Sequence, residues 1–106
     1  MTRMLINVPA QAKRGEIVEI KTLIAHPMES GFRMGTNATP IPRDIITLFT
    51  CAYNGTEIFR AELSPAIAAN PFIAFFTVAA DSGMLEFRWT VDNGFSATET
   101  ARIDVE

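Results

Sequence analysis

The chain has 106 residues, 48% of them hydrophobic and 20% charged, with a formal net charge of −3. This length suits a single domain, residues 1–106, with one hydrophobic core, and the composition is that of a globular protein. The nine basic residues are scattered along the chain, which argues against nucleic acid as a partner. No apolar run reaches the roughly 18 residues of a membrane-spanning helix, so we expect no membrane partner either.

The N-terminal segment MTRMLINVPA has no apolar stretch followed by a small-residue cleavage site. It therefore predicts no signal peptide, and the chain alone indicates a cytoplasmic location. The single cysteine, Cys51, cannot form an internal disulfide, so the stability of the fold must come from packing.

Turn-forming residues recur at short intervals and separate seven β-rich runs, which is typical of an all-β sandwich. We expect antiparallel strands at residues 3–8, 16–25, 44–53, 56–63, 72–80, 84–92 and 95–105. The pairs Asn54-Gly55 and Asn93-Gly94 tolerate positive φ and predict type I′ hairpins between the strands that flank them.

The segment from His26 to Asp44 is long for a connection in a sandwich, and long loops in compact domains are often functional. It combines adaptable apolar side chains with two cations, namely Met28, Phe32, Met34, Arg33 and Arg43. This mixture favours a binding loop. A flexible insertion without a function is the alternative.

Cys51 and His26 are the only residues of their types. A reactive thiol needs a nearby cation, helix N-terminus or metal together with solvent access, and the apolar strand around Cys51 offers none of these. The two residues lack the spacing of a metal site. We therefore expect a structural cysteine, an ordinary loop histidine, no metal and no cofactor.

Residues 64–70 read SPAIAAN and precede Pro71. Ser64 is a good N-cap, Pro65 suits the first helical position, and Asn70 tolerates a left-handed exit. We expect one helical turn here, as a short crossover helix or a 3₁₀ turn at 64–70.

The following strand, PFIAFFTVAA, is apolar on both faces, whereas a strand with one solvated face should alternate. We assign Phe72, Phe76 and Val78 to the core and leave Ile73 and Phe75 facing outward. A partner that covers this second face is the simplest way to avoid exposing large apolar side chains.

The strand MLEFRWTVD alternates strictly, with a core face formed by Leu85, Phe87, Trp89 and Val91. Four carboxylates are expected on solvated turns or strand faces: Asp81, Glu86, Asp92 and Glu99. No apolar pocket is indicated that would raise one of their pKa values for acid catalysis. The chain also lacks a phosphate-binding loop and hydrolase or metalloprotease motifs.

Taken together, these stretches closely resemble the SoxZ family, one subunit of the heterodimeric SoxYZ carrier of the bacterial sulfur-oxidising (Sox) system. The resemblance covers essentially the whole chain. It is carried by LINVPAQAKRGEIVEIKTLIAHPMESGFR, IPRDII, FTCAYNGTEIFRAELSPAIAANPFIAFF and SGMLEFRWTVDNG. Its most specific parts are KRGE with HPMESG, and FRAEL followed by PAIAANPF.

The resemblance implies an immunoglobulin-like sandwich that pairs with SoxY, with a further dimer of heterodimers as an option and with transient contacts to other Sox enzymes. In that family, SoxY carries sulfur intermediates of thiosulfate oxidation covalently on a cysteine in a Gly-rich C-terminal arm. The present chain ends ETARIDVE, without a glycine-flanked cysteine, so the resemblance implies a non-catalytic subunit. It also implies a periplasmic location, reached by export bound to SoxY.

The predicted partner interface comprises Met28, Phe32, Arg33, Asn70, Phe72, Ile73 and Phe75. Two alternatives stay open at this point. One is a small thiol enzyme that uses Cys51 with His26. The other is a homodimeric β-sandwich binding module.

Overall fold

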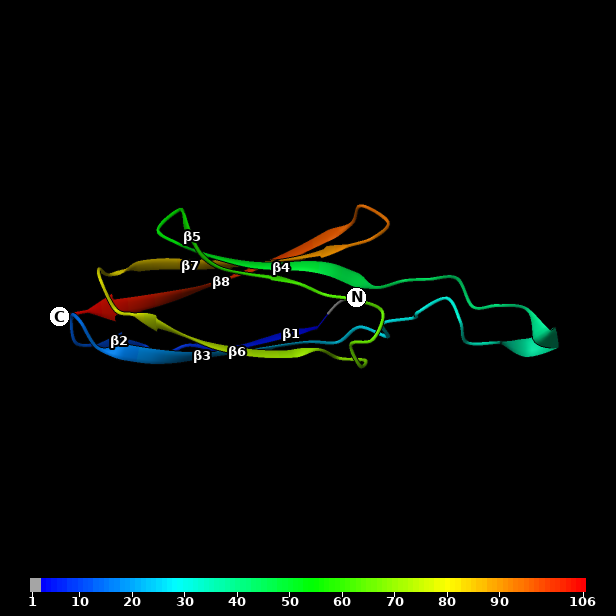
Figure 1. Ribbon diagram of the computed structural model, residues 1–106. Helices are drawn as coiled ribbons and strands as arrows, with labels where there is room; N and C mark the ends of the chain where they lie inside the picture. The colour runs from blue at the N-terminus through cyan, green and yellow to red at the C-terminus, as the bar shows by residue number, and fades with distance from the viewer. Residues whose placement is uncertain (1–2) are drawn as a thin grey trace.

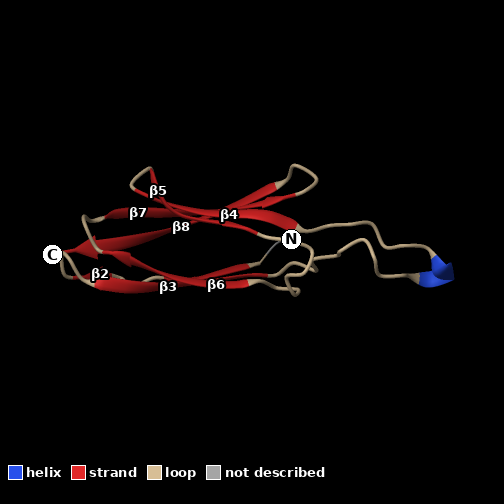
Figure 2. Ribbon diagram, viewed as in Figure 1, coloured by secondary structure: helices blue, strands red, loops and turns tan. Residues whose placement is uncertain are grey.

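The computed structural model describes residues 3–106, so the first two residues of the expected domain 1–106 lie outside the described part. It confirms the all-β sandwich: eight strands form two layers (Figures 1 and 2). The strands are β1 (Met4–Asn7), β2 (Gln11–Ala12), β3 (Ile17–Ile24), β4 (Ile46–Tyr53), β5 (Thr56–Glu62), β6 (Phe72–Val78), β7 (Gly83–Val91) and β8 (Ser96–Val105). One sheet has three strands in the order β1-β3-β6, and the other has five in the order β2-β8-β7-β4-β5.

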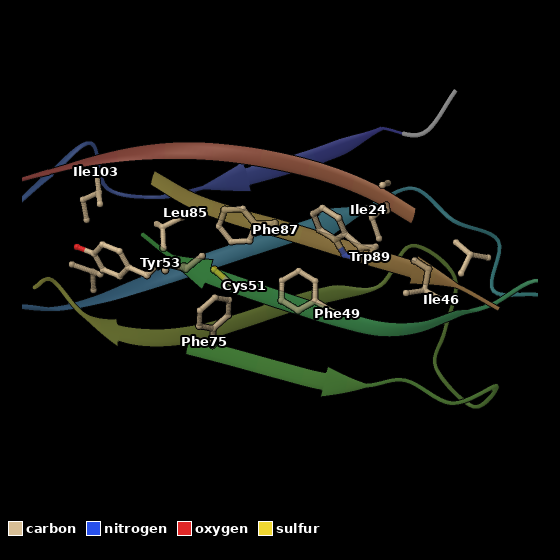
Figure 3. Packing of buried hydrophobic residues seen from close by; sticks show 14 of the residues in the cluster. Ile24, Ile46, Phe49, Cys51, Tyr53, Phe75, Leu85, Phe87, Trp89 and Ile103 are labelled. Atoms are coloured by element: carbon tan, nitrogen blue, oxygen red, sulfur yellow. The ribbon is translucent and has the colours of Figure 1, made fainter. Parts of the chain in front are cut away.

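The core lies between the two sheets, because the inward positions of β3, β4 and β7 are large and apolar. Phe49, Phe87 and Trp89 are completely buried, and the ring of Phe49 lies 5.2 Å from that of Trp89 (Figure 3). Each fully buried side chain of this size contributes about 1.5–3 kcal/mol of transfer free energy. The strict alternation of β7 confirms the predicted division into a buried face and a solvated face.

Seven strands lie within two residues of their expected bounds, and all their neighbour pairings are antiparallel. The two-residue β2, which was not expected, pairs parallel with β8. Asn54 and Gly55 both have positive φ (49° and 85°), as a type I′ turn requires. The second predicted hairpin is also present, between β7 and β8. Its turn is not of type I′, because only Gly94 (φ 91°) has positive φ there, and Asn93 Oδ1 instead accepts a hydrogen bond from the Phe95 N–H.

Of the two forms expected for the crossover at 64–70, the structure shows the single turn and not a helix. The segment forms a single turn, in which the Ile67 N–H donates to the Ser64 carbonyl (3.1 Å) and the Ala66 N–H donates to Ser64 Oγ (3.3 Å). Ser64 thus caps a turn that does not continue into a helix. Asn70 has the expected left-handed conformation, with φ 55°.

The sequence assignment of the two faces of β6 is wrong, because the side chains point the opposite way. Phe75 is buried in the core (6% exposed) and Ile73 is half-buried, whereas Phe72, Phe76 and Val78 are exposed. The phase is set by pairing with β3, where Ile20 lies opposite Phe75 and both point inward. Phe75 and Ile73 are therefore unavailable as the outward face on which their predicted interface role depended.

Residues 26–44 form a projecting arm that extends the molecule to 59 × 22 × 20 Å. Figure 1 shows the arm leaving the sandwich at the end opposite the C-terminus. Two isolated bridges, Glu29 with Asp44 and Met34 with Pro40, hold its two sides together. Near its tip lies a 3₁₀ turn at Thr36–Ala38. None of the helices described in residues 3–106 is long and apolar enough to cross a membrane.

Candidate partner-binding surface

The outer face of the three-stranded sheet carries apolar side chains in register across all three strands. Leu5 of β1 lies opposite Leu23 of β3, and Leu23 lies opposite Phe72 of β6, so these three residues form one continuous row. Leu5 is 59% exposed and Phe72 is 61% exposed. We use the name outer face for this surface, whose apolar members are Leu5, Ile17, Leu23, Phe72, Ala74, Phe76 and Val78.

A hollow lies on each side of the row formed by Leu5, Leu23 and Phe72. One, of about 230 Å³, is lined by Leu5 and Leu23 together with Arg3 and Asn70. The other, of about 440 Å³, lies beside Lys21, which pairs with Glu19 (3.6 Å) on the same face. Each hollow therefore combines apolar walls with one cationic side chain, an arrangement that suits a partner with apolar ridges and carboxylates.

The outer face of the five-stranded sheet differs in character. Apart from Met84, its exposed positions on β7 and β8 are polar or charged: Glu86, Arg88, Ser96, Thr98, Thr100, Arg102 and Asp104. A sheet face covered by such side chains is stable in water without a partner. The contrast identifies the outer face of the three-stranded sheet as the candidate partner-binding surface.

The arm is anchored at its base by residues of the sandwich. The buried Met28 has positive φ (51°), and its sulfur lies 3.3 Å from the Ile46 nitrogen, which donates to it. Nδ1 of His26 accepts from the Met28 N–H (3.0 Å), and its Nε2 lies 3.3 Å from Asp44 Oδ1. Met28 is therefore a structural anchor, and its predicted role in the interface requires an exposure that it lacks.

The other predicted interface residues of the arm lie further out. Phe32 is 86% exposed. Arg33 pairs with Glu29 (2.6 Å), and its hydrogen bond holds the pKa of that carboxyl below the ordinary value, while the same pair raises the pKa of Arg33. Asn70 ties the loop before β6 to the base of the arm, because its side-chain Oδ1 accepts from the His26 N–H (2.9 Å).

Cys51 lies completely buried in the middle of β4, beside Phe75 and Phe87 (Figure 3). Burial raises the pKa of its thiol to about 12, so the thiolate needed for nucleophilic attack does not form near neutral pH. His26 contacts Asp44, and the stretch of β4 from Ile46 to Cys51 separates that contact from the thiol by roughly 16 Å. This geometry gives no support to the thiol-enzyme alternative.

Within residues 3–106, no group of three or more His, Cys, Asp or Glu side chains is arranged to hold a metal ion. The carboxylates singled out in the sequence have ordinary surroundings. Asp81 pairs with Arg14 (2.6 Å), Asp92 pairs with Arg43 (2.9 Å), and Glu86 lies exposed on β7. Glu99 is half-buried on the inward side of β8, and its Oε1 accepts a hydrogen bond from the neighbouring Thr100 N–H.

A match to a known protein family shows to which family the chain belongs. The family model described as Sulphur oxidation protein SoxZ matches residues 6–102. The chain belongs to the SoxZ family. This membership confirms the resemblance and gives the chain a role in sulfur oxidation by the Sox system. A search of curated protein sequences finds no significant match.

Several solved structures share the architecture of this SoxZ family chain. A superoxide reductase (neelaredoxin) from Ignicoccus hospitalis matches with a TM-score of 0.78 and 18% identity, over 99% of this chain and 82% of the reductase. The sulfur carrier protein SoxY from Chlorobium limicola f thiosulfatophilum matches with a TM-score of 0.68 and 13% identity, over 97% of this chain and 78% of SoxY. Identities this low establish a shared fold only.

The sequence did not identify Leu5, Phe76 and Val78 as members of the outer face. Leu23 and Ile17 are recognisable from the sequence as the apolar members of the partly polar side of strand 16–25. What the sequence could not supply was the pairing of β1, β3 and β6, which brings three distant segments into one apolar row.

Proposed function

We propose that this chain is the non-catalytic, partner-binding subunit of a SoxYZ-type heterodimer, in which the SoxY subunit carries the sulfur intermediates of thiosulfate oxidation. The observation that carries the proposal is the apolar row Leu5–Leu23–Phe72 on an uncovered sheet face. Large contiguous apolar patches on soluble proteins mark interaction sites. Family membership supports SoxY as the occupant of this surface.

The two cationic hollows support the same assignment. Arg3 and Lys21 lie at the borders of the apolar row, where charges raise the association rate and select the partner more than they add affinity. The proposed partner therefore presents apolar side chains flanked by carboxylates. The buried, unreactive state of Cys51 supports a subunit whose own cysteine takes no part in sulfur transfer.

The proposal includes a periplasmic location, with export bound to SoxY, since a partner-binding subunit needs no separate export signal if it leaves the cytoplasm in the complex. It also includes transient contacts with the enzymes that act on the carried group. The projecting arm, with Phe32 exposed, is the element best placed to make such contacts.

Co-purification tests the heterodimer. A tagged SoxY carrier protein from the same organism is co-expressed with the wild-type chain, with Leu5→Asp, or with Thr98→Asp. Leu5 lies on the outer face and Thr98 on the exposed side of β8, so both variants add one charge to a solvated strand position. We expect SoxY to retain the wild type and Thr98→Asp and to lose Leu5→Asp, since a buried unpaired carboxylate is costly.

Retention of all three proteins at equal yield would place the interface elsewhere on the chain. Failure of SoxY to retain the wild type would contradict the proposed function itself. Circular dichroism of each purified variant confirms that it is folded.

A further inference from the structure

Strand β6 is an edge strand of the three-stranded sheet, and its outward backbone groups have no partner within residues 3–106. The Ile24 N–H donates to the Pro71 carbonyl (3.3 Å), and the Ala79 N–H donates to the Glu16 carbonyl (2.8 Å). Because hydrogen-bonded positions alternate along an antiparallel pair, odd-numbered residues of β6 bond to β3. The four residues that direct their N–H and C=O groups toward the open edge are Phe72, Ala74, Phe76 and Val78.

This edge lacks the features that usually protect edge strands from pairing with other chains. Such strands tend to be short, charged, bulged or interrupted by proline. β6 reads FIAFFTV over seven residues without a charge or a proline. The edge strand β5, in contrast, carries Glu57, Arg60 and Glu62, and its pairing with β4 contains a bulge. The other edge of the three-stranded sheet, β1, has only four residues.

The open edge of β6 lies on the same side of the sandwich as β5, the edge strand of the other sheet. The Phe75 ring of β6 stacks on Phe59 of β5, with centroids 4.4 Å apart, and lies 6.3 Å from Phe49 of β4. Ile58 and Phe59 of β5 are only half-buried.

The inward side chains of the three-stranded sheet are less buried on β6 than on β3. All the inward side chains of β3 are buried: Val18, Ile20, Thr22 and Ile24. On β6, Ile73 and Thr77 are only half-buried. A hollow of about 290 Å³, lined in part by Ile58 and Thr77, lies at this side of the sandwich.

We propose that β6 accepts a β-strand from the SoxY-type partner, which extends the three-stranded sheet by a fourth strand beside β6. This inference rests on the proposed function, since it names how the same partner binds. The incoming backbone pairs with the edge groups of β6, and alternate side chains point inward toward the half-buried Ile58. Apolar side chains suit these inward positions, because Ile58 is apolar.

The position of the edge favours the SoxY-type partner over a second copy of this chain. The edge is continuous with the outer face, because Phe72 and Phe76 belong to both. A SoxY-type sandwich can therefore supply a strand to the edge and cover the apolar row in one interface.

Amide hydrogen exchange of the full chain, alone and bound to SoxY, tests the inference by NMR. In the free chain, the amides of Phe72, Ala74 and Phe76 are expected to exchange rapidly, and those of Ile73 and Phe75 slowly, because only the latter bond to β3. In the complex, the edge amides should slow by at least about tenfold, while Ile73 and Phe75 change little.

A pair of variants provides a second, independent measurement. Ala74→Pro removes an edge N–H and blocks strand addition, at a position where an edge strand tolerates proline. Ala74→Gly keeps the N–H and controls for loss of the side chain. We expect Ala74→Pro to weaken binding of SoxY by about tenfold or more, and Ala74→Gly to retain most of the wild-type affinity.

The outcomes separate this inference from the proposed function. If SoxY binds, but the edge amides stay unprotected and both Ala74 variants bind with equal affinity, strand addition is wrong and the proposed function still holds. Concentration-dependent protection of the edge amides in the isolated chain would overturn it in favour of a second copy. If SoxY does not bind the wild-type chain at all, both proposals are contradicted.

Discussion

On β6, the adjacent side chains of Phe75 and Phe76 point to opposite sides of the sheet and have different environments. Phe75 contacts the rings of Phe49 and Phe59 inside the core, whereas Phe76 is 67% exposed. Both residues are phenylalanines and both lie on β6. Their contributions to stability and to binding should therefore be separable by substitution.

Replacing Phe75 by Ala should lower the free energy of unfolding by about 3–5 kcal/mol, because it removes buried contacts and leaves a cavity. The matched variant Phe76→Ala should cost less than about 1 kcal/mol, since its ring leaves a solvated surface. Urea denaturation followed by tryptophan fluorescence measures both. Equal destabilisation by the two variants would show that the inward and outward assignments are wrong.

Residue patterns could not fix the direction of these side chains. A strand that is apolar at every position has no alternation from which to read its phase. The phase comes from β3, more than fifty residues earlier in the chain, where the period of two at Val18 and Ile20 determines which side of β6 faces inward. The strand's existence could be predicted from composition, but its register needed this distant partner.

At the scale of elements, strands with clear alternation or clear turns were predictable. β7 alternates strictly, and the Asn54-Gly55 turn fixes the hairpin between β4 and β5. The two-residue β2 carries too little pattern to detect. Residues 64–70 form one turn and not a helix, because a helix also needs an apolar face to pack, and Ile67 remains exposed.

The arm was predictable as a long functional loop, but its shape was not. Its two sides contact each other mainly through isolated bridges and local pairs, and Gly31 lies close against Arg43, where a Cβ would come within 3.2 Å of that side chain. Only its base, through Met28 and His26, contributes to the sandwich. We infer that the arm beyond this base adds little to folding stability.

Replacing residues 31–42 with an Asn-Gly turn tests this separation. The unfolding free energy should change by less than about 1 kcal/mol, because the deleted part holds no buried core and a shorter loop costs less closure entropy. Thermal and urea unfolding of the full and shortened chains give the comparison. A loss of several kcal/mol, or of cooperative unfolding, would mean that the arm is part of the folding unit.

At the scale of the whole molecule, the two sheets have different surroundings. The five-stranded sheet is mainly polar outside, whereas the three-stranded sheet carries a continuous apolar row beside the charged Glu19 and Lys21 and is open at its β6 edge. Membership of the SoxZ family gives the chain a role in sulfur oxidation by the Sox system. We propose that a SoxY-type partner covers the outer face of the three-stranded sheet.

Hydroxyl-radical footprinting with mass spectrometry tests that claim most directly. The oxidation rates of Phe72 and Phe76 are measured in the free chain and in its mixture with SoxY, with Phe95 as an internal control that is equally exposed but lies after β7. We expect SoxY to reduce the labelling of Phe72 and Phe76 by several-fold and to leave Phe95 unchanged. Unchanged labelling of both phenylalanines in a mixture that contains the complex would contradict the account.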